Sequence, residues 1–159
     1  KSEAREAVRK AGTELAQPFV DGRFIGGTMT NWPEIKKRIA MLEDLTTKRE
    51  KGELGHYTKK ERLLIDRKID KLALYFSGLS TMKGLPKFLI VVDPKKEHIA
   101  VAEAKRIRIP VIAIAGSDNN IFDVDFAIPA NDSSKASIGL IMEKIVLAYK
   151  AGAASAKVA

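Results

Sequence analysis

The sequence predicts an α/β fold in which helices flank a parallel sheet and an antiparallel coiled-coil helical hairpin is inserted. Between Phe88 and Ala115, two apolar runs rich in β-branched residues lie on either side of a helical pattern, as strands buried on both faces require. Between Pro33 and Phe76, two helical patterns with matching narrow apolar stripes are joined by a short turn. The 159 residues, 45% of them apolar, are enough for one globular domain with a core.

The N-terminal segment predicts a helix followed by a loop. Residues 2–16 place apolar side chains at helical spacing, namely Ala4, Ala7, Val8, Ala11 and Leu15. A short strand is predicted at 18–20, and a loop with two adjacent glycines follows at 23–32, which we call the Gly-Gly loop. The sequence begins at Lys1, without Met and inside the predicted helix, which suggests a fragment or a processed chain.

The hairpin is predicted at 32–77, as an insertion into an α/β domain formed by 1–31 and 78–150. Its first stripe contains Ile35, Ile39 and Leu42, and its second contains Ile65, Ile69, Leu72 and Phe76. Residues 51–57, with two glycines, form the turn between the helices. Thr58, with Glu61 three residues later, predicts a capping box at the start of the second helix.

The C-terminal half alternates strands and helices, which predicts βαβ connections. Strands are predicted at 88–92, 111–115 and 126–128, with a helix from Pro94 to about Ile107 after the first strand. A last helix should be capped by Asn131, Asp132 or Ser133 and should bury Ile138, Ile141, Ile145 and Leu147 or Ala148. Residues 151–159, rich in alanine, glycine and serine, are predicted to be a flexible tail.

The charge of the chain favours an anionic partner. The formal net charge is +8, and residues 32–83 carry +5 of it, with thirteen basic and eight acidic side chains. A solvated helix face explains mixed charges, but it explains a surplus of one sign less well. The basic side chains of the hairpin that would lie along a phosphate backbone are Lys36, Lys37, Arg38, Lys48, Arg49, Lys59, Lys60, Arg62, Arg67, Lys68 and Lys71.

Two segments carry the residue types that bind phosphates and sugars. In the Gly-Gly loop, two glycines permit positive φ and close approach, and Arg23, Thr28, Thr30 and Asn31 supply donors. The alternative is a tight turn capped by Asn31 before Pro33, and the residues alone slightly favour it. Residues 95–98, which contain Lys95, Lys96 and His98, are predicted to lie at a helix start, either as a phosphate contact or as a solvated helix end.

Several classes of function lack the residues that they need. The chain has no cysteine and two histidines, so it lacks a disulfide framework and a cysteine-based zinc site. It has no apolar run near the ~18–20 residues of a membrane span and no signal segment, so we expect a soluble protein. No glycine-rich dinucleotide or P-loop motif is present. We therefore expect no cofactor.

An acidic metal site is the alternative function. Asp93, Asp118, Asp123 and Asp125 lie at or after predicted strand ends, where parallel sheets bind ligands. Asp93 and Asp118 would be the centre of a metal-dependent signalling or phosphoryl-transfer domain. No general base, nucleophile motif or phosphate clamp accompanies them, so turn formation and helix capping are the favoured roles of these aspartates.

Several short motifs occur in a defined order. Residues 23–31 are Arg-Phe-Ile-Gly-Gly-Thr-Met-Thr-Asn, residues 84–86 are Gly-Leu-Pro, and residues 93–104 are centred on Lys-Glu-His-Ile-Ala. Ile-Pro-Val follows at 109–111 and Ile-Pro-Ala-Asn-Asp at 128–132. Together they resemble the bacterial-type small-subunit ribosomal protein S-two family, whose signature is Arg-Trp-Leu-Gly-Gly-Thr-Leu-Thr-Asn. The sequence departs from that family at Phe24 and Ala130, and it lacks the family's N-terminal His-Phe-Gly-His type motif and first strand.

The resemblance implies a Rossmann-like or flavodoxin-like parallel sheet with an inserted coiled-coil hairpin. It also implies a structural role in translation: binding small-subunit ribosomal RNA beside neighbouring ribosomal proteins and helping the large mRNA-binding protein S-one to dock. No catalytic residue, metal, membrane or small-molecule substrate is implied. The implied location is a cytoplasmic ribosome, and an organellar ribosome stays open. The predicted RNA-binding residues are Arg23, Gly26, Gly27, Thr28, Thr30, Asn31, Lys36, Lys37, Lys95, Lys96 and His98.

Overall fold

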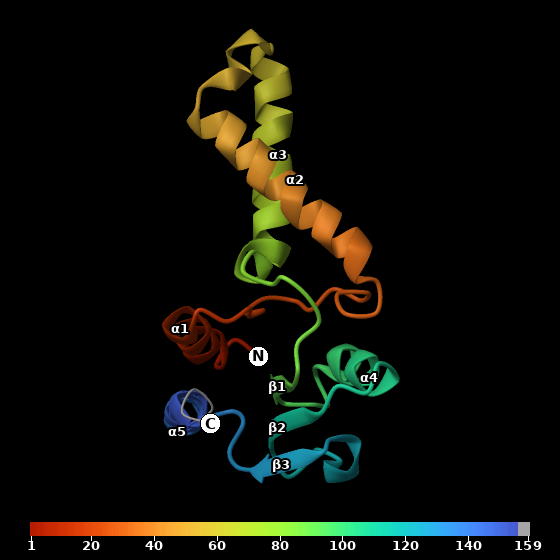
Figure 1. Cartoon of the computed structure of the whole chain (residues 1–159), viewed down its shortest axis with the longest axis vertical. Helices are drawn as coiled ribbons and strands as arrows, with labels where there is room; N and C mark the ends of the chain where they lie inside the picture. The colour runs from red at the N-terminus through yellow and green to blue at the C-terminus, as the bar shows by residue number, and fades with distance from the viewer. Residues whose placement is uncertain (156–159) are drawn as a thin grey trace.

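The computed structural model describes residues 1–155 and contains a parallel three-stranded sheet (Figure 1). Its strands are β1 (Leu89–Val92), β2 (Val111–Ala115) and β3 (Phe126–Pro129), in the order β1-β2-β3. Val91 is opposite Ala113, and Ala113 is opposite Ala127. The prediction of an α/β fold with a parallel sheet is confirmed, and each strand lies within one residue of its predicted bounds.

The two faces of the sheet are covered by different elements. On one face, Val92 and Ile114 pack against α1 (Arg5–Leu15) and α5 (Lys135–Ser155), which lie side by side in Figure 1. On the other face, Val91 and Ala113 pack against α4 (His98–Arg106) and against Met29 of the Gly-Gly loop. The alternation of side chains along each strand therefore builds two separate cores, and one of them holds the loop.

Residues 32–79 form a helical arm that projects from the α/β domain (Figure 1). The arm contains α2 (Trp32–Glu50), the 3₁₀ turn η1 (Glu53–His56), α3 (Lys59–Phe76) and the 3₁₀ turn η2 (Ser77–Leu79). The capping box of Thr58 and Glu61 is confirmed. The buried side chains of the two long helices lie in the half next to the domain: Ile35, Ile39, Leu42, Ile69, Leu72 and Phe76.

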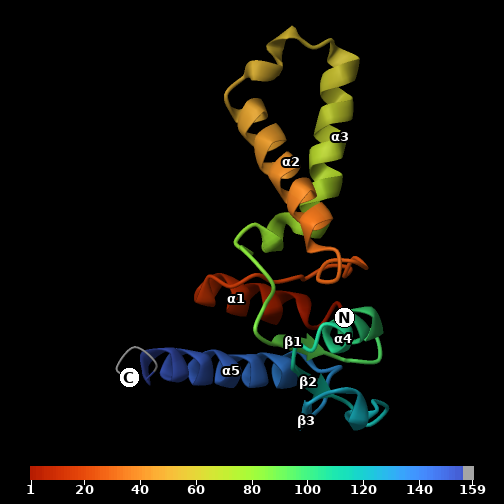
Figure 2. The ribbon, with the colours of Figure 1, turned by 45° about the vertical axis from the view of Figure 1, so that its right-hand side comes forward.

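The outer halves of α2 and α3 separate from each other toward η1 (Figure 2). Ile65, a member of the second predicted stripe, is only half-buried, and so is Leu45, which widens the first predicted stripe. The helical hairpin is thus present, and the buried contacts between its two long helices are limited to the base of the arm, while Leu54 is buried in the turn η1. Coiled-coil packing along its whole length stays a prediction.

Two predictions near the sheet are wrong. No strand forms at 18–20, where Phe19 instead packs its ring against Gly12 and Gly78 and donates its backbone N–H to the Gly78 carbonyl. The helix after β1 begins at His98 rather than Pro94. Its start is delayed because Asp93 takes a left-handed φ of 64° and accepts a hydrogen bond from the backbone N–H of Lys96.

The last helix also differs from its prediction. Ser134 takes the capping position that we expected at Asn131, Asp132 or Ser133, and its hydroxyl accepts from the backbone N–H of Ser137. The buried side chains of α5 are Ile138, Met142 and Val146, while Leu147 is 59% exposed. The helix continues to Ser155, so residues 151–155 are helical rather than part of a tail. The rest of the predicted tail, 156–159, lies outside the described residues.

Across residues 1–155, no helix combines the length and apolar character that a membrane span needs.

Candidate nucleic-acid interface

The Gly-Gly loop is a compact turn that is held by its own backbone. Gly27 has a φ of 89°, a conformation that favours glycine. The Ile25 carbonyl accepts from both the backbone N–H and the hydroxyl of Thr28, at 3.1 and 2.5 Å. The backbone N–H of Asn31 donates to the Gly27 carbonyl at 2.8 Å. Only the second glycine therefore needs its positive φ.

A carboxylate from α4 completes the loop. Glu103 accepts hydrogen bonds from the backbone N–H groups of Gly27, Met29 and Thr30, with distances of 3.0 Å to Met29 and 3.1 Å to Thr30. The Glu103 side chain is on the buried face of α4, and the residue is 9% exposed. Sequence reasoning missed this role. A signal was available, since Glu103 stands three residues after Ala100 and four before Ile107, on the apolar face of the helix.

The structure separates the predicted loop residues into two groups. Arg23, Gly26, Thr30 and Asn31 are exposed. Thr28 is 3% exposed, and its hydroxyl donates to the Ile25 carbonyl within the loop. Asn31 precedes α2 but its side chain makes no capping hydrogen bond, so it is available to a partner.

The loop lies beside the starts of two helices. A Cβ on Gly26 would stand 3.8 Å from the Ile99 side chain in the first turn of α4, and Figures 1 and 2 both show the loop next to α4. His98 is the first residue of α4, and Lys36 and Lys37 lie in the first turns of α2; all three are exposed. Lys95 and Lys96 are exposed in the turn before α4 rather than in the helix.

Two of these lysines already have acidic partners. Lys37 contacts Glu34 at 2.6 Å and Lys95 contacts Asp118 at 3.0 Å, where the hydrogen bond lowers the pKa of the Asp118 carboxyl. Within residues 1–155, Arg23, Lys36 and Lys96 have no ion pair. Exposed pairs such as these exchange easily with other anions, because each contributes only about 0–1 kcal/mol.

The helical arm carries a larger basic surface. Lys48 pairs with Asp44, and Arg49 lies 3.8 Å from Asp66. Lys37 also pairs with Glu34. The remaining basic side chains predicted for the arm are exposed and have no ion pair in the described part of the chain: Lys36, Arg38, Lys59, Lys60, Arg62, Arg67, Lys68 and Lys71. An arm with so many uncompensated cations can follow a polyanion such as a nucleic-acid backbone.

The aspartates of the alternative metal site are held by different lysines. Asp93 and Asp132 both contact the Lys1 ammonium, at 2.7 and 2.8 Å, and all three side chains are largely buried. Burial alone would lower the pKa of Lys1, but hydrogen bonds to Asp132 and Asp93 outweigh it and raise that pKa. Asp118 is paired with Lys95 instead. Among the described residues, no group of three or more histidine and acidic side chains is placed to hold a metal.

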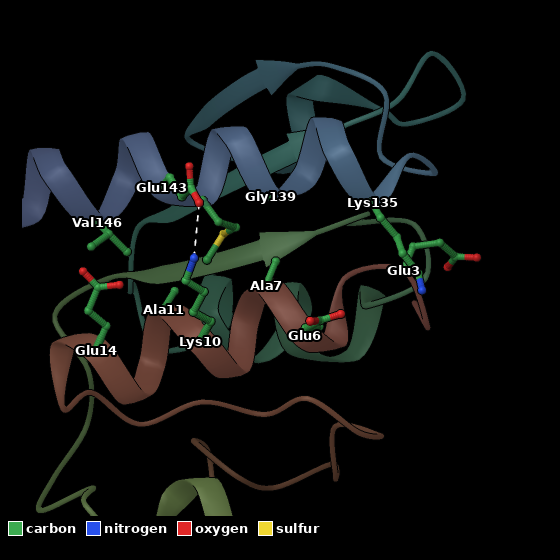
Figure 3. Close-up of a pocket in the computed structure, with 11 residues that line it drawn as sticks. Glu3, Glu6, Ala7, Lys10, Ala11, Glu14, Lys135, Gly139, Glu143 and Val146 are labelled. Atoms are coloured by element: carbon green, nitrogen blue, oxygen red, sulfur yellow. Dashed lines mark hydrogen bonds and ion pairs between the residues drawn. The ribbon is translucent and has the colours of Figure 1, made fainter.

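The cleft shown in Figure 3 is separate from these residues. It lies between α1 and α5, has a volume of about 180 Å³, and contains both acidic and basic side chains. Lys10 and Glu143 face each other across it at 3.3 Å. None of the predicted RNA-binding residues lines it. The candidate interface is therefore the exposed surface of the Gly-Gly loop, the two helix starts and the arm.

Comparison with known proteins gives two findings. The protein-family model described as Ribosomal protein S2 matches residues 1–152. The small ribosomal subunit protein uS2 of Bdellovibrio bacteriovorus is 43% identical over 153 residues, which are 96% of this chain and 49% of that relative. The chain thus spans about half the length of the curated relative that it matches.

Proposed function

Because the chain belongs to the ribosomal protein S2 family, we propose that it is a structural, non-catalytic constituent of the small ribosomal subunit. The observation that carries this proposal is the family match over residues 1–152, which confirms the resemblance of the sequence motifs. In this role the chain is part of a ribonucleoprotein that acts in translation. Its proposed partners are small-subunit ribosomal RNA and the neighbouring ribosomal proteins.

The proposed RNA contact has three parts. In the Gly-Gly loop, Arg23, Thr30 and Asn31 present exposed side chains, Gly26 leaves room for the RNA, and Gly27 and Thr28 maintain the shape of the loop. Beside it, the exposed cations are Lys36, Lys37, Lys95, Lys96 and His98, the last when protonated. The geometry supports this assignment because the loop touches the first turn of α4 and leads directly into α2.

The helical arm supplies the third part. We propose that 32–77 is a coiled-coil insertion into a domain formed by 1–31 and 78–150, and that its basic surface follows phosphates away from the domain. The uncompensated positive charge of the arm supports this assignment. Docking of the large mRNA-binding protein S-one and location on a cytoplasmic ribosome are further predictions from the family.

A competition measurement tests the proposed function. The chain should bind small-subunit ribosomal RNA more tightly than large-subunit ribosomal RNA fragments of the same length, at a fixed salt concentration near physiological. Fixed salt is necessary because nonspecific phosphate binding alone varies steeply with it. Equal affinity for the two RNAs would mean that the chain is only a general polyanion binder, and the proposal would fail.

A further inference from the structure

We propose that Glu103 is a positioning residue for RNA binding, which acts by filling the anion site of the Gly-Gly loop from inside the protein. This inference rests on the proposed function, since it concerns how the same loop contacts RNA. Glu103 belongs to α4, more than 70 residues after the loop in sequence. Its carboxylate nevertheless accepts three backbone N–H groups of the loop.

The backbone N–H groups of residues 27–31, in the second half of the loop, are all used. Gly27, Met29 and Thr30 donate to Glu103, Thr28 donates to Ile25, and Asn31 donates to Gly27. A glycine-containing turn with several N–H groups pointing inward is the arrangement that binds phosphate in many proteins. Here the carboxylate occupies that position. The N–H groups of residues 27–31 are therefore closed to RNA, and in this part of the loop RNA would meet the exposed side chains of Thr30 and Asn31.

Glu103 lies beside a packed core. Its neighbours Val101 and Ala104 are buried in the core between α4 and the sheet, and Met29 of the loop enters the same core. No lysine or arginine contacts the Glu103 carboxylate in the part of the chain that the structure describes. The backbone of the loop is thus the partner that compensates for burying this charge. Loop and helix fix each other, and Arg23, Thr30 and Asn31 are held in place on the outside.

A glutamine at position 103 cannot accept the same three hydrogen bonds from the loop. It keeps the size of glutamate, but it replaces one acceptor oxygen by an NH₂ group that would face backbone donors. The Glu103→Gln variant should therefore free at least one of the three loop amides. It also makes the protein more positive, which by electrostatics alone should strengthen RNA binding. If Glu103→Gln binds RNA more weakly than the wild type, the change in charge cannot be the cause, because that change acts in the opposite direction.

The experiment compares Glu103→Gln with Glu97→Gln, which changes the charge equally. Glu97 precedes α4 and makes no hydrogen bond to the loop. Amide hydrogen exchange is measured at Gly27, Met29 and Thr30, together with the affinity for small-subunit ribosomal RNA. We expect Glu103→Gln to accelerate exchange at these amides and to weaken RNA binding about tenfold, equivalent to about 1.4 kcal/mol. Glu97→Gln should do neither.

The outcomes distinguish this inference from the proposed function. If Arg23→Ala weakens binding but Glu103→Gln does not, the loop contacts RNA without needing Glu103, and the positioning role is overturned alone. If Arg23→Ala also leaves the affinity unchanged, the RNA contact of the loop is itself wrong. Should Glu103→Gln not fold, the pair Glu103→Asp and Glu103→Asn replaces it, since the two side chains match in size. Equal RNA affinity of that pair would contradict a role for the carboxylate.

Discussion

At the scale of single residues, the shape of the Gly-Gly loop depends on Gly27 and Glu103. Gly27 has the positive φ that the turn requires, and the Glu103 carboxylate accepts hydrogen bonds from three backbone N–H groups of the turn. The exposed side chains of Arg23, Thr30 and Asn31 are a consequence of that shape. The residues that would meet RNA and the residues that prepare the surface are thus different residues.

The two glycines of the loop should respond differently to alanine. Gly27→Ala forces a β-carbon into a left-handed conformation and should lower the free energy of unfolding by about 1–2 kcal/mol. Gly26→Ala is the matched control, because its φ lies outside the left-handed range and its β-carbon would meet Ile99 at an ordinary 3.8 Å. We expect a change within about 0.5 kcal/mol there. Urea denaturation measures both, and equal effects would contradict the assignment of the strain to Gly27.

At the scale of elements, the conformation of the arm follows from local sequence signals, whereas that of the Gly-Gly loop depends on contacts with residues distant in sequence. The capping box at Thr58 lies within four residues and could be read from the sequence. The strands at 89–92 and 111–115 could also be predicted, because burial on both faces leaves a continuous apolar run. The start of α4 could not, since it depends on the left-handed conformation of Asp93. The helical spacing could show that Glu103 lies on the buried face of α4, but it could not show its hydrogen-bond partners, which are distant in sequence.

The start of α3 gives a prediction for the arm. Thr58→Ala removes the hydroxyl that accepts from the Glu61 backbone N–H and should cost about 1 kcal/mol of stability. The exchange of the Glu61 amide should become faster at the same time. Thr47→Ala, at an exposed position inside α2, is the control and should be neutral or slightly stabilising because alanine favours helices. If both variants lose the same stability, the capping box does not stabilise α3.

At the scale of the whole molecule, buried charges hold the domain together while exposed charges face outward. Lys1 joins Asp93, after β1, to Asp132, after β3, so one ammonium links the N-terminal segment to both outer strands. The exposed cations of the arm and of the helix starts have few acidic partners among residues 1–155. Stability and the proposed RNA binding should therefore depend on different charges, and they can be tested separately.

The buried pair predicts how stability changes in acid. Burial opposes ionisation of Asp132, but the hydrogen bond from Lys1 prevails and holds the pKa of Asp132 below its ordinary value of 3.8. A depressed pKa contributes stability that is present above the unfolded-state pKa and is lost as the pH falls through the folded-state pKa. As the pH is lowered from about 5 to about 2, the free energy of unfolding of Asp132→Asn should therefore fall by less than that of the wild type.

The control for this prediction is Asp70→Asn, at an exposed position of α3 that makes no ion pair in the described part of the chain. Its stability should follow that of the wild type as the pH is lowered. Urea denaturation at a series of pH values gives the free energy of unfolding for each variant. If Asp132→Asn loses as much stability as the wild type in acid, the contact with Lys1 does not stabilise the fold.

The central claim, that the Gly-Gly loop and the start of α2 contact ribosomal RNA, is tested most directly by salt dependence. The affinity for small-subunit ribosomal RNA is measured over a range of salt for the wild type, Arg23→Ala, Lys36→Ala/Lys37→Ala and the control Lys135→Ala/Lys144→Ala on α5. We predict weaker binding for the first two variants, with the slope against log salt reduced by about one unit for the arginine and by roughly one to two for the lysine pair. The α5 control should match the wild type. The claim is contradicted if all four proteins show the same affinity and the same slope.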